Sequence, residues 1–144
     1  MDEQIAQLLA DYPIISHVPV QWADMDRNQH VNNVIYLKYV EVSRLDYFQA
    51  IGFFDFTGEK PGPILADTEC KYIFPATYPD EIYMGSRISK MSDTDFILQT
   101  LLISKKHKKV VAKNESRVVV FDYGQQKKVS MGEEMKQRIA ALEA

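Results

Sequence analysis

A cluster of polar residues lies directly ahead of a long apolar segment. Between positions 24 and 33 the chain places carboxylates, carboxamides and an imidazole close together, namely Asp24, Asp26, Asn28, His30, Asn32 and Asn33. If the apolar segment is a helix, its first N–H groups are unpaired and lie at the positive end of the helix dipole, so they can polarise a carbonyl group or hold an anion. A carboxylate just before such a helix start can attack that carbonyl or activate water. We therefore take residues 24–33 as the candidate catalytic segment.

The apolar segment over residues 34–51 predicts one long helix. It contains neither proline nor glycine, and Gly52 follows where a glycine commonly ends a helix. Asn32 or Asn33 is suited to be its N-cap. At 3.6 residues per turn two faces of the helix are apolar, one with Val34, Leu37, Leu45 and Phe48 and the other with Tyr36, Val40, Tyr47 and Ile51. We therefore expect this helix to be buried on most of its sides.

Alternating apolar residues predict the strands of an antiparallel sheet. Strands are expected over residues 17–22, 64–74, 81–91, 96–104 and 110–121, and shorter helices over residues 2–11 and 132–143. Pro19 suits a sheet edge, the even-numbered residues of 64–74 should share one face, and short turns should join the last four strands in a meander. This order predicts an α+β fold, with the sheet wrapped around the central helix, as one domain over residues 1–144. Because an open sheet leaves edges, we expect a homodimer or a homotetramer.

The overall composition excludes several classes of protein. A net charge of −3 gives no indication of nucleic acid as a partner. The acidic start lacks a signal-peptide pattern, and no apolar run reaches membrane-spanning length, so we expect a cytoplasmic protein with no membrane partner. Cys70 is the only cysteine, and the histidines do not lie at ligand spacing. We therefore expect no metal and no cofactor.

The polar cluster resembles a motif of the hotdog-fold acyl-thioesterase superfamily. The resemblance rests on Asp-x-Asp-x-Asn-x-His-Val-Asn-Asn-x-x-Tyr over residues 24–36, followed by Tyr39, Glu41 and Arg44. A second, less specific stretch runs from Tyr72 to Ala76 and is followed by Asp80 and Glu81. The nearest branches are bacterial acyl-CoA thioesterases of the 4-hydroxybenzoyl-CoA thioesterase type and plant fatty acyl-ACP thioesterases. The similarity covers approximately residues 14–124.

The resemblance implies a hotdog dimer or tetramer that hydrolyses acyl thioesters without a metal, at active sites on the dimer interface. Asp26 matches the acid that these families use as nucleophile or general base. Asn28 and His30 match an asparagine and a histidine of the plant branch, which makes all three the catalytic candidates. This chain has Asn33 where one bacterial branch has a histidine, and Pro75-Ala76 where the plant branch has a Glu-Cys pair. The division of labour among the three candidates therefore stays open.

Further residues near the cluster are candidates for substrate binding: Trp22, Asn33, Val34 and Tyr36. Backbone N–H groups near residues 32–34 are candidates to face the substrate carbonyl, and Trp22 either walls the site or fills the core. Phe53, Phe54 and Phe56 either line an acyl tunnel or pack in the core or an interface. Residues 105–109 either meet coenzyme A phosphates or form a solvated, charged hairpin tip.

Structural roles compete with the catalytic ones. Aspartates in a loop are commonly turn residues or caps, and for Asp24 we favour a role in holding the loop. A lone histidine such as His30 is commonly a surface or packed residue. Glu41 is expected to pair with Lys38 or Arg44 rather than to take part in catalysis.

The sequence as a whole predicts an acyl-CoA thioesterase, which converts an acyl-CoA and water into a free carboxylic acid and coenzyme A. The alternatives are an acyl-ACP thioesterase, a hydratase or dehydratase of acyl thioesters, and a non-catalytic acyl-binding module on the same scaffold. The longer central-helix motif that accompanies the catalytic histidine of hotdog hydratases is not found here. Release of free thiol from acyl-CoA separates hydrolysis from the hydratase and binding alternatives.

Overall fold

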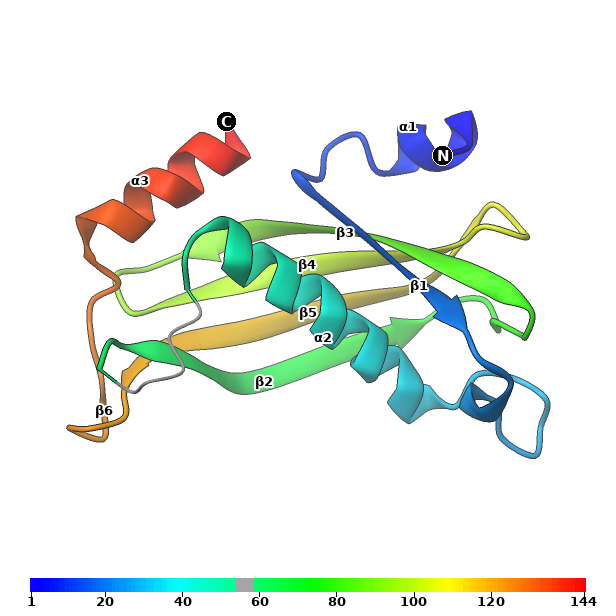
Figure 1. Cartoon of the computed structure of the whole chain (residues 1–144), viewed down its shortest axis with the longest axis horizontal. Helices are drawn as coiled ribbons and strands as arrows, with labels where there is room; N and C mark the ends of the chain where they lie inside the picture. The colour runs from blue at the N-terminus through cyan, green and yellow to red at the C-terminus, as the bar shows by residue number, and fades with distance from the viewer. Residues whose placement is uncertain (54–58) are drawn as a thin grey trace.

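The computed structural model of the chain describes residues 1–53 and 59–144. Along the chain lie α1 (Glu3–Leu8), β1 (Ile14–Val20), the 3-10 turn η1 (Trp22–Asp24), α2 (Asn33–Ala50), β2 (Gly62–Tyr72), β3 (Asp80–Met91), β4 (Asp95–Ser104), β5 (Lys109–Asp122), β6 (Lys127–Lys128) and α3 (Gly132–Glu143). Figure 1 shows one curled sheet with α2 running along it. The predicted α+β arrangement, with an antiparallel sheet around a central helix, is confirmed.

The strands pair in the order β1–β3–β4–β5–β2, and β6 pairs with the end of β5. The predicted meander is confirmed for β3, β4 and β5 but wrong for β2, which lies beside β5 rather than beside β3. Local turn signals cannot reveal this long-range pairing, because the linker from β2 to β3 passes across the sheet. In the described chain β1 pairs only with β3, in agreement with Pro19 as an edge residue.

Two strands differ from their predicted course. β1 begins and ends earlier than the strand predicted over residues 17–22, because the chain turns into η1 at Trp22. In β2 the pairing register shifts between Leu65 and Asp67, which makes a bulge at Ala66. A shift of one residue moves the following side chains to the other face of a strand. The single face predicted for residues 64–74 is therefore interrupted at the bulge.

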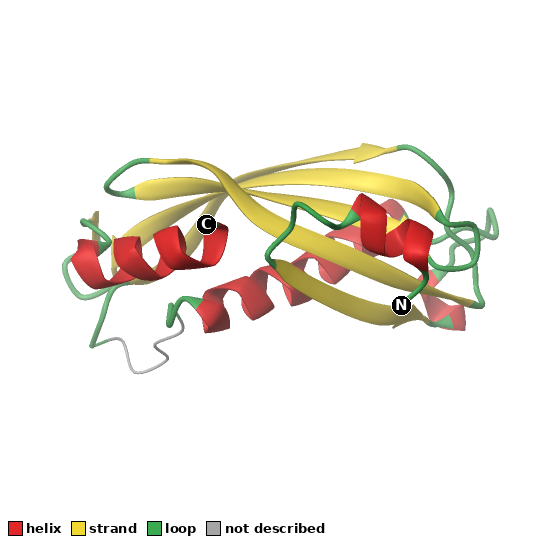
Figure 2. Cartoon of the chain, turned by 90° about the horizontal axis from the view of Figure 1, so that it is seen from above, coloured by secondary structure: helices red, strands yellow, loops and turns green. Residues whose placement is uncertain are grey.

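Helix α2 lies along the concave side of the sheet (Figure 2). Asn32 is its N-cap, and the Asn32 Oδ1 accepts the Val34 N–H at 3.0 Å. Gly52 follows the helix end with a φ of +73°, as predicted from its position. This backbone conformation favours glycine, and a β-carbon there would lie 2.0 Å from the Arg138 guanidinium and displace the end of that side chain.

One face of α2 is almost fully buried in the single chain. The side chains of this face are at most 3% exposed, namely Tyr36, Val40, Tyr47 and Ile51. On the other predicted apolar face Val34 is 68% exposed and Leu45 is 50% exposed, and only Phe48, near the helix end, is buried. The expectation that the helix is buried on most sides is therefore wrong for the single chain, because the sheet curls over one side of α2 only.

Helix α1 covers the opposite face of the sheet. Ile5 and Leu9 pack against Leu101 and Ile103 of β4, whereas the intervening Leu102 belongs to the core beneath α2. Because successive side chains of a strand point to opposite faces, the two helices lie on opposite sides of β4. The helix predicted over residues 2–11 is confirmed over a shorter span.

Helix α3 covers the core at the C-terminal end of α2, over the span that the sequence predicts. The Tyr47 hydroxyl and the Ile88 N–H both donate to the Glu143 carboxylate, the N–H at 3.0 Å. The core beneath α3 includes Phe53, which is 2% exposed and packs against aromatic neighbours. Phe53 is therefore a core residue here, while Phe54 and Phe56 lie outside the described residues.

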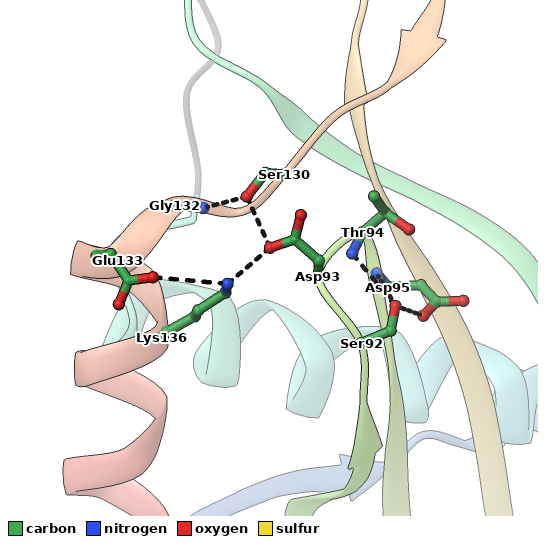
Figure 3. A network of polar contacts seen from close by, with 8 residues as sticks. All are labelled: Ser92, Asp93, Thr94, Asp95, Ser130, Gly132, Glu133 and Lys136. Carbon is green, nitrogen blue, oxygen red and sulfur yellow. Dashed lines mark hydrogen bonds and ion pairs between the residues drawn. The ribbon is translucent and has the colours of Figure 1, made fainter.

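The start of α3 is tied to the turn between β3 and β4, as Figure 3 shows. In this turn the Asp93 carboxylate accepts a hydrogen bond from the Ser130 hydroxyl at 2.8 Å and pairs with Lys136 at 2.6 Å. The Met131 N–H donates to the Asp93 carbonyl at 2.9 Å. These contacts fix α3 against the sheet at one end, and Glu143 fixes it at the other.

Candidate active site

The candidate catalytic segment folds into a tight turn that leads directly into α2. The Asp26 N–H donates to the His30 carbonyl at 3.0 Å, and the Gln29 N–H donates to the Asp26 carbonyl at 3.0 Å. Gln29 takes a left-handed conformation with a φ of 64°, which closes the turn. The Val31 N–H then donates to the Ala76 carbonyl at 2.9 Å. The turn therefore brings Asp26 and His30 together through their backbones and joins them to the linker between β2 and β3.

The Asp26 carboxylate is half-buried and keeps capacity to accept further hydrogen bonds. Its Oδ1 accepts the Asn28 N–H at 2.8 Å, and the described residues provide no other hydrogen bond to this carboxylate. It is therefore the backbone of Asn28, rather than its carboxamide, that holds Asp26. The second carboxylate oxygen remains available to a water molecule or a substrate.

Asp24 anchors the segment to α2. Its Oδ2 accepts the Tyr39 hydroxyl at 2.6 Å and the Gln21 N–H at 2.9 Å, and its carbonyl accepts the Asn32 N–H at 2.9 Å. Burial, followed by the contact with the Asp24 carboxylate, raises the pKa of Tyr39 far above its usual value, so the hydroxyl keeps its proton and donates. The predicted loop-holding role of Asp24 agrees with these contacts.

Three of the predicted residues line one pocket of about 230 Å³. They are His30, Asn33 and Tyr36. His30 is exposed, whereas Tyr36 is buried, and the Tyr36 hydroxyl accepts the Ala76 N–H at 3.0 Å. Burial raises the pKa of Tyr36, so this hydroxyl stays protonated and can also donate a hydrogen bond. The pocket thus combines an imidazole, a phenol and the start of a helix.

The opposite wall of this pocket was not predicted as part of a site. It is formed by Tyr72, Ile73, Phe74 and Pro75. The Tyr72 hydroxyl donates to the Asn33 carbonyl at 3.0 Å, and the Tyr72 ring meets the Tyr36 ring edge-on at 5.2 Å. The alternating pattern extended the strand to Phe74, but β2 ends at Tyr72, and the N–H groups of Ile73 and Phe74 both donate to the Val111 carbonyl. The second stretch of the family resemblance was the signal that could have found them.

The other predicted residues do not line this pocket. Trp22 lies on η1 and is 71% exposed. Val34 faces a separate groove of about 270 Å³ between α2 and β2, where Leu65 lies on the strand side. Asp26 and Asn28 line neither cavity and lie in the adjoining turn. The single chain therefore gathers part of the predicted site, and the catalytic and binding roles of these residues stay predictions.

Charged residues of α2 also line the groove between α2 and β2: Lys38, Glu41 and Arg44. Burial lowers the pKa of Arg44, and the charge of Glu41 acts in the opposite direction. The described residues hold no direct ion pair of Glu41 with Lys38 or Arg44, so the predicted pairing is not formed in the single chain. This groove is amphipathic, with apolar walls and a charged margin.

Comparisons with known proteins give the family. A family model described as the thioesterase-like superfamily matches residues 20–139. The chain belongs to this superfamily. The matched range contains the candidate catalytic segment, all of α2 and most of α3. None of the curated proteins matches the chain.

Solved structures resemble this thioesterase-like protein over most of its length. A thioesterase from Thermus thermophilus, complexed with coenzyme A and Zn, is 28% identical, with a TM-score of 0.80 over 92% of this chain and 96% of that one. A putative thioesterase from Pseudomonas aeruginosa is 22% identical, with a TM-score of 0.80 over 89% of this chain and 98% of that one. A DHNA-CoA thioesterase from Staphylococcus aureus is 17% identical, with a TM-score of 0.79 over 90% of this chain and 91% of that one. The predicted hotdog fold is thereby confirmed.

The described residues of this superfamily member contain no cluster of side chains that could bind a metal ion. Over residues 1–53 and 59–144, no three histidine, cysteine or acidic side chains are grouped as a metal site requires. Burial raises the pKa of the Cys70 thiol, so it is a weak candidate for a nucleophile. In the same residues no helix is long and apolar enough to cross a membrane.

Proposed function

We propose that the protein is an acyl-CoA thioesterase, which hydrolyses acyl-CoA to a free carboxylic acid and coenzyme A. The observation that carries this proposal is the turn that holds Asp26 and His30 at the start of α2, beside a pocket that His30 lines. Membership of the thioesterase-like superfamily and the coenzyme A bound to the Thermus thermophilus thioesterase support the same substrate class.

In the proposed reaction the carbonyl oxygen of the thioester lies at the N-terminus of α2. The Val34 N–H is already taken by the Asn32 side chain, whereas the Asn33 N–H has no partner among the described residues. The Asn33 N–H is therefore the donor best placed to stabilise the negative charge that develops on that oxygen. The positive end of the helix dipole adds to this stabilisation.

Asp26 supplies the attack in either of two ways. As a general base, its carboxylate takes a proton from water, the resulting hydroxide bonds to the carbonyl carbon, and the carbon–sulfur bond breaks. As a nucleophile, the carboxylate itself bonds to that carbon and expels the thiolate, and water then hydrolyses the mixed anhydride. In both routes His30 can donate the proton that the leaving thiolate needs, as the general acid of the reaction. Asn28 orients Asp26 through its backbone N–H.

We further propose that the site is completed by a second copy in a homodimer, with a homotetramer as a pair of such dimers. The exposed face of α2, the edge strand β2 and the amphipathic groove between them form one continuous uncovered surface. Trp22 and Val34, exposed in the single chain, would become walls of the substrate path in the dimer.

We place the whole chain, residues 1–144, in one hotdog domain. Its composition favours a cytoplasmic location with neither a nucleic acid nor a membrane as partner.

A thiol-release assay tests the proposed function directly. The purified protein is incubated with a series of acyl-CoA thioesters, aliphatic of increasing length and aromatic, and free coenzyme A is measured with a thiol reagent. We expect enzyme-dependent release for at least one of these acyl classes. If every substrate is bound but none is hydrolysed, the protein is an acyl-binding module and the proposal is wrong.

A further inference from the structure

The turn between β4 and β5 carries a concentration of positive charge in a chain whose net charge is −3. We call residues 105–109 the basic hairpin; they are Lys105, Lys106, His107, Lys108 and Lys109. Figure 1 shows its tip at the same end of the molecule as η1 and the start of α2. The charge therefore lies near the candidate active site rather than at a remote point of the surface.

Contacts with one aromatic side chain link the basic hairpin to the pocket. The Lys109 Nζ lies 4.9 Å from the centre of the Phe74 ring, and the His107 ring centre lies 5.0 Å from it. Phe74 is also a wall of the pocket that His30 and Asn33 line. A molecule that extends out of this pocket across Phe74 would thus meet Lys109 and His107.

The backbone of the basic hairpin is held in place before any ligand binds. The Asp80 carboxylate accepts the Ser104 hydroxyl and, at 2.9 Å, the Lys106 N–H. The Lys105 N–H donates to the Glu81 carbonyl at 2.9 Å, and the Lys108 N–H donates to the Ser104 carbonyl at 2.8 Å. A tip fixed by several hydrogen bonds presents its side chains at little further entropic cost.

The acids near the basic hairpin compensate only part of its charge. Lys105 lies 3.6 Å from Glu81, which also contacts His17, and Lys108 lies 3.1 Å from Asp2. Asp80, the third acid in contact with the hairpin, is engaged by the hydrogen bonds described above. Across the described residues Lys106 and Lys109 take part in no ion pair. Two lysine charges therefore remain for an anionic ligand.

We propose that the basic hairpin binds the phosphate groups of the coenzyme A part of the substrate, with Lys109 and Lys106 supplying the charge and His107 a hydrogen bond. The inference rests on the proposed function, since the acyl end of the substrate must occupy the pocket. A lysine is a compact point charge that suits phosphate oxygens, and its attraction persists over several ångströms of water. The hairpin would then favour thioesters that carry a phosphorylated nucleotide over thioesters of pantetheine alone.

An acyl-carrier protein is the competing anionic partner. The favoured ligand is coenzyme A, because the two unpaired lysines lie on a single hairpin beside the pocket and offer little surface for docking a protein. A carrier protein would have to be recognised over a larger basic area. The test therefore compares coenzyme A thioesters with acyl-carrier protein thioesters.

The first measurement is binding by calorimetry, with coenzyme A and with pantetheine as probes. The variants are Lys109→Ala and the double variant with Lys106→Ala, with Lys109→Arg as the conservative change and Lys90→Ala, on β3, as the control. We expect Lys109→Ala to weaken coenzyme A binding roughly 2- to 5-fold, on the scale of an exposed charge pair, and the double variant to weaken it further. Pantetheine binding should not change, and Lys109→Arg and Lys90→Ala should behave like the wild type. An unchanged affinity for coenzyme A in the double variant overturns the inference.

The second measurement is thiol release from an acyl-CoA and from the same acyl group carried on pantetheine and on an acyl-carrier protein. We expect the double variant to raise KM for the acyl-CoA with kcat nearly intact, while both parameters for acyl-pantetheine stay unchanged. If the double variant loses activity only towards an acyl-carrier protein thioester, the hairpin recognises the protein and the inference is wrong. If the wild type binds coenzyme A through the hairpin but hydrolyses nothing, the inference holds and the proposed function is wrong.

Discussion

At the scale of the residue, the carboxylates of Asp24 and Asp26 lie two positions apart in the chain but have different hydrogen-bond partners. The Asp24 carboxylate accepts hydrogen bonds from the Tyr39 hydroxyl and the Gln21 N–H, so it holds the turn against α2. The Asp26 carboxylate accepts one backbone N–H, from Asn28, and retains lone pairs for water or substrate. The difference comes from the turn, which directs Asp24 towards α2 and leaves Asp26 beside the residues that line the pocket.

The role of His30 can be measured by replacement. His30→Ala should lower turnover by about 10²-fold or more, the usual scale for a general acid or base. His17→Ala is the control, because that exposed histidine pairs with Glu81 on the sheet edge. A variant whose KM rises while turnover stays intact would show that His30 only positions the substrate. Wild-type values of both parameters would exclude His30 from the site.

At the scale of the element, α2 and α3 are held by polar contacts at their ends as well as by the core. Asn32 caps the start of α2, and Arg138 of α3 donates to the Ile51 carbonyl at its end at 3.3 Å. Glu143 joins the last turn of α3 to α2 through Tyr47 and to β3 through the Ile88 N–H. These contacts keep α2 fixed on the sheet, and the start of α2 is the part that the proposed chemistry uses.

The contact between α2 and α3 predicts a graded loss of stability. Tyr47→Phe removes one hydroxyl donor and should lower the free energy of unfolding by about 1 kcal/mol. Glu143→Ala leaves both the buried Tyr47 hydroxyl and the Ile88 N–H without their acceptor, so it should cost more, about 2–4 kcal/mol. Chemical denaturation measures both, and thiol release should be little affected by Tyr47→Phe. Equal stability of Glu143→Ala and the wild type would mean that α3 is held by apolar packing alone.

At the scale of the whole molecule, the single chain leaves an apolar surface of α2 uncovered beside a sheet edge. One face of α2 is buried in the core, while the other exposes Val34 and Leu45 beside the edge strand β2. Apolar helix surface next to an unpaired strand edge is commonly covered by a second subunit. The proposed dimer would cover both and would close the groove between α2 and β2.

Light scattering at micromolar concentration tests the assembly. We expect a mass of at least twice the 16.6 kDa of the chain. Leu45→Glu, on the uncovered face of α2, should shift the equilibrium towards the monomer and lower turnover. Leu8→Glu, an exposed leucine on α1 at the opposite face of the sheet, should do neither. A stable monomer with full activity would contradict the proposed dimer.

Much of the fold follows from local patterns, because helices and meanders are encoded by neighbouring residues. The span of α3, the end of α2 just before Gly52 and the strands β3 to β5 agree with the sequence to within a residue or two. The place of β2 beside β5 and the bulge at Ala66 depend on pairing between distant segments, which periodicity does not contain. The open face of α2 was missed for a related reason, since an apolar pattern does not say whether the same chain or another copy covers it.

The candidate site was predictable in part. His30, Asn33 and Tyr36 meet in one pocket because the turn and the first turn of α2 are continuous in the chain. The wall from Tyr72 to Pro75 arrives from another part of the chain, and its alternating residues were interpreted as a strand. The positions of Trp22 and Val34 outside this pocket follow from the orientation of η1 and from the exposed face of α2.

The central claim is that the Asp26 carboxylate drives thioester hydrolysis, and comparison of Asp26→Asn with Asp24→Asn tests it most directly. An amide of nearly the same shape cannot act as base or nucleophile, so Asp26→Asn should reduce turnover roughly 10²- to 10⁴-fold while binding of coenzyme A and the melting temperature are retained. Asp24→Asn disturbs the anchor to Tyr39, so it should lower the melting temperature and cost less activity than Asp26→Asn. The measurement is thiol release together with thermal unfolding for both variants. Hydrolysis of acyl-CoA by Asp26→Asn at the wild-type rate would contradict the mechanism.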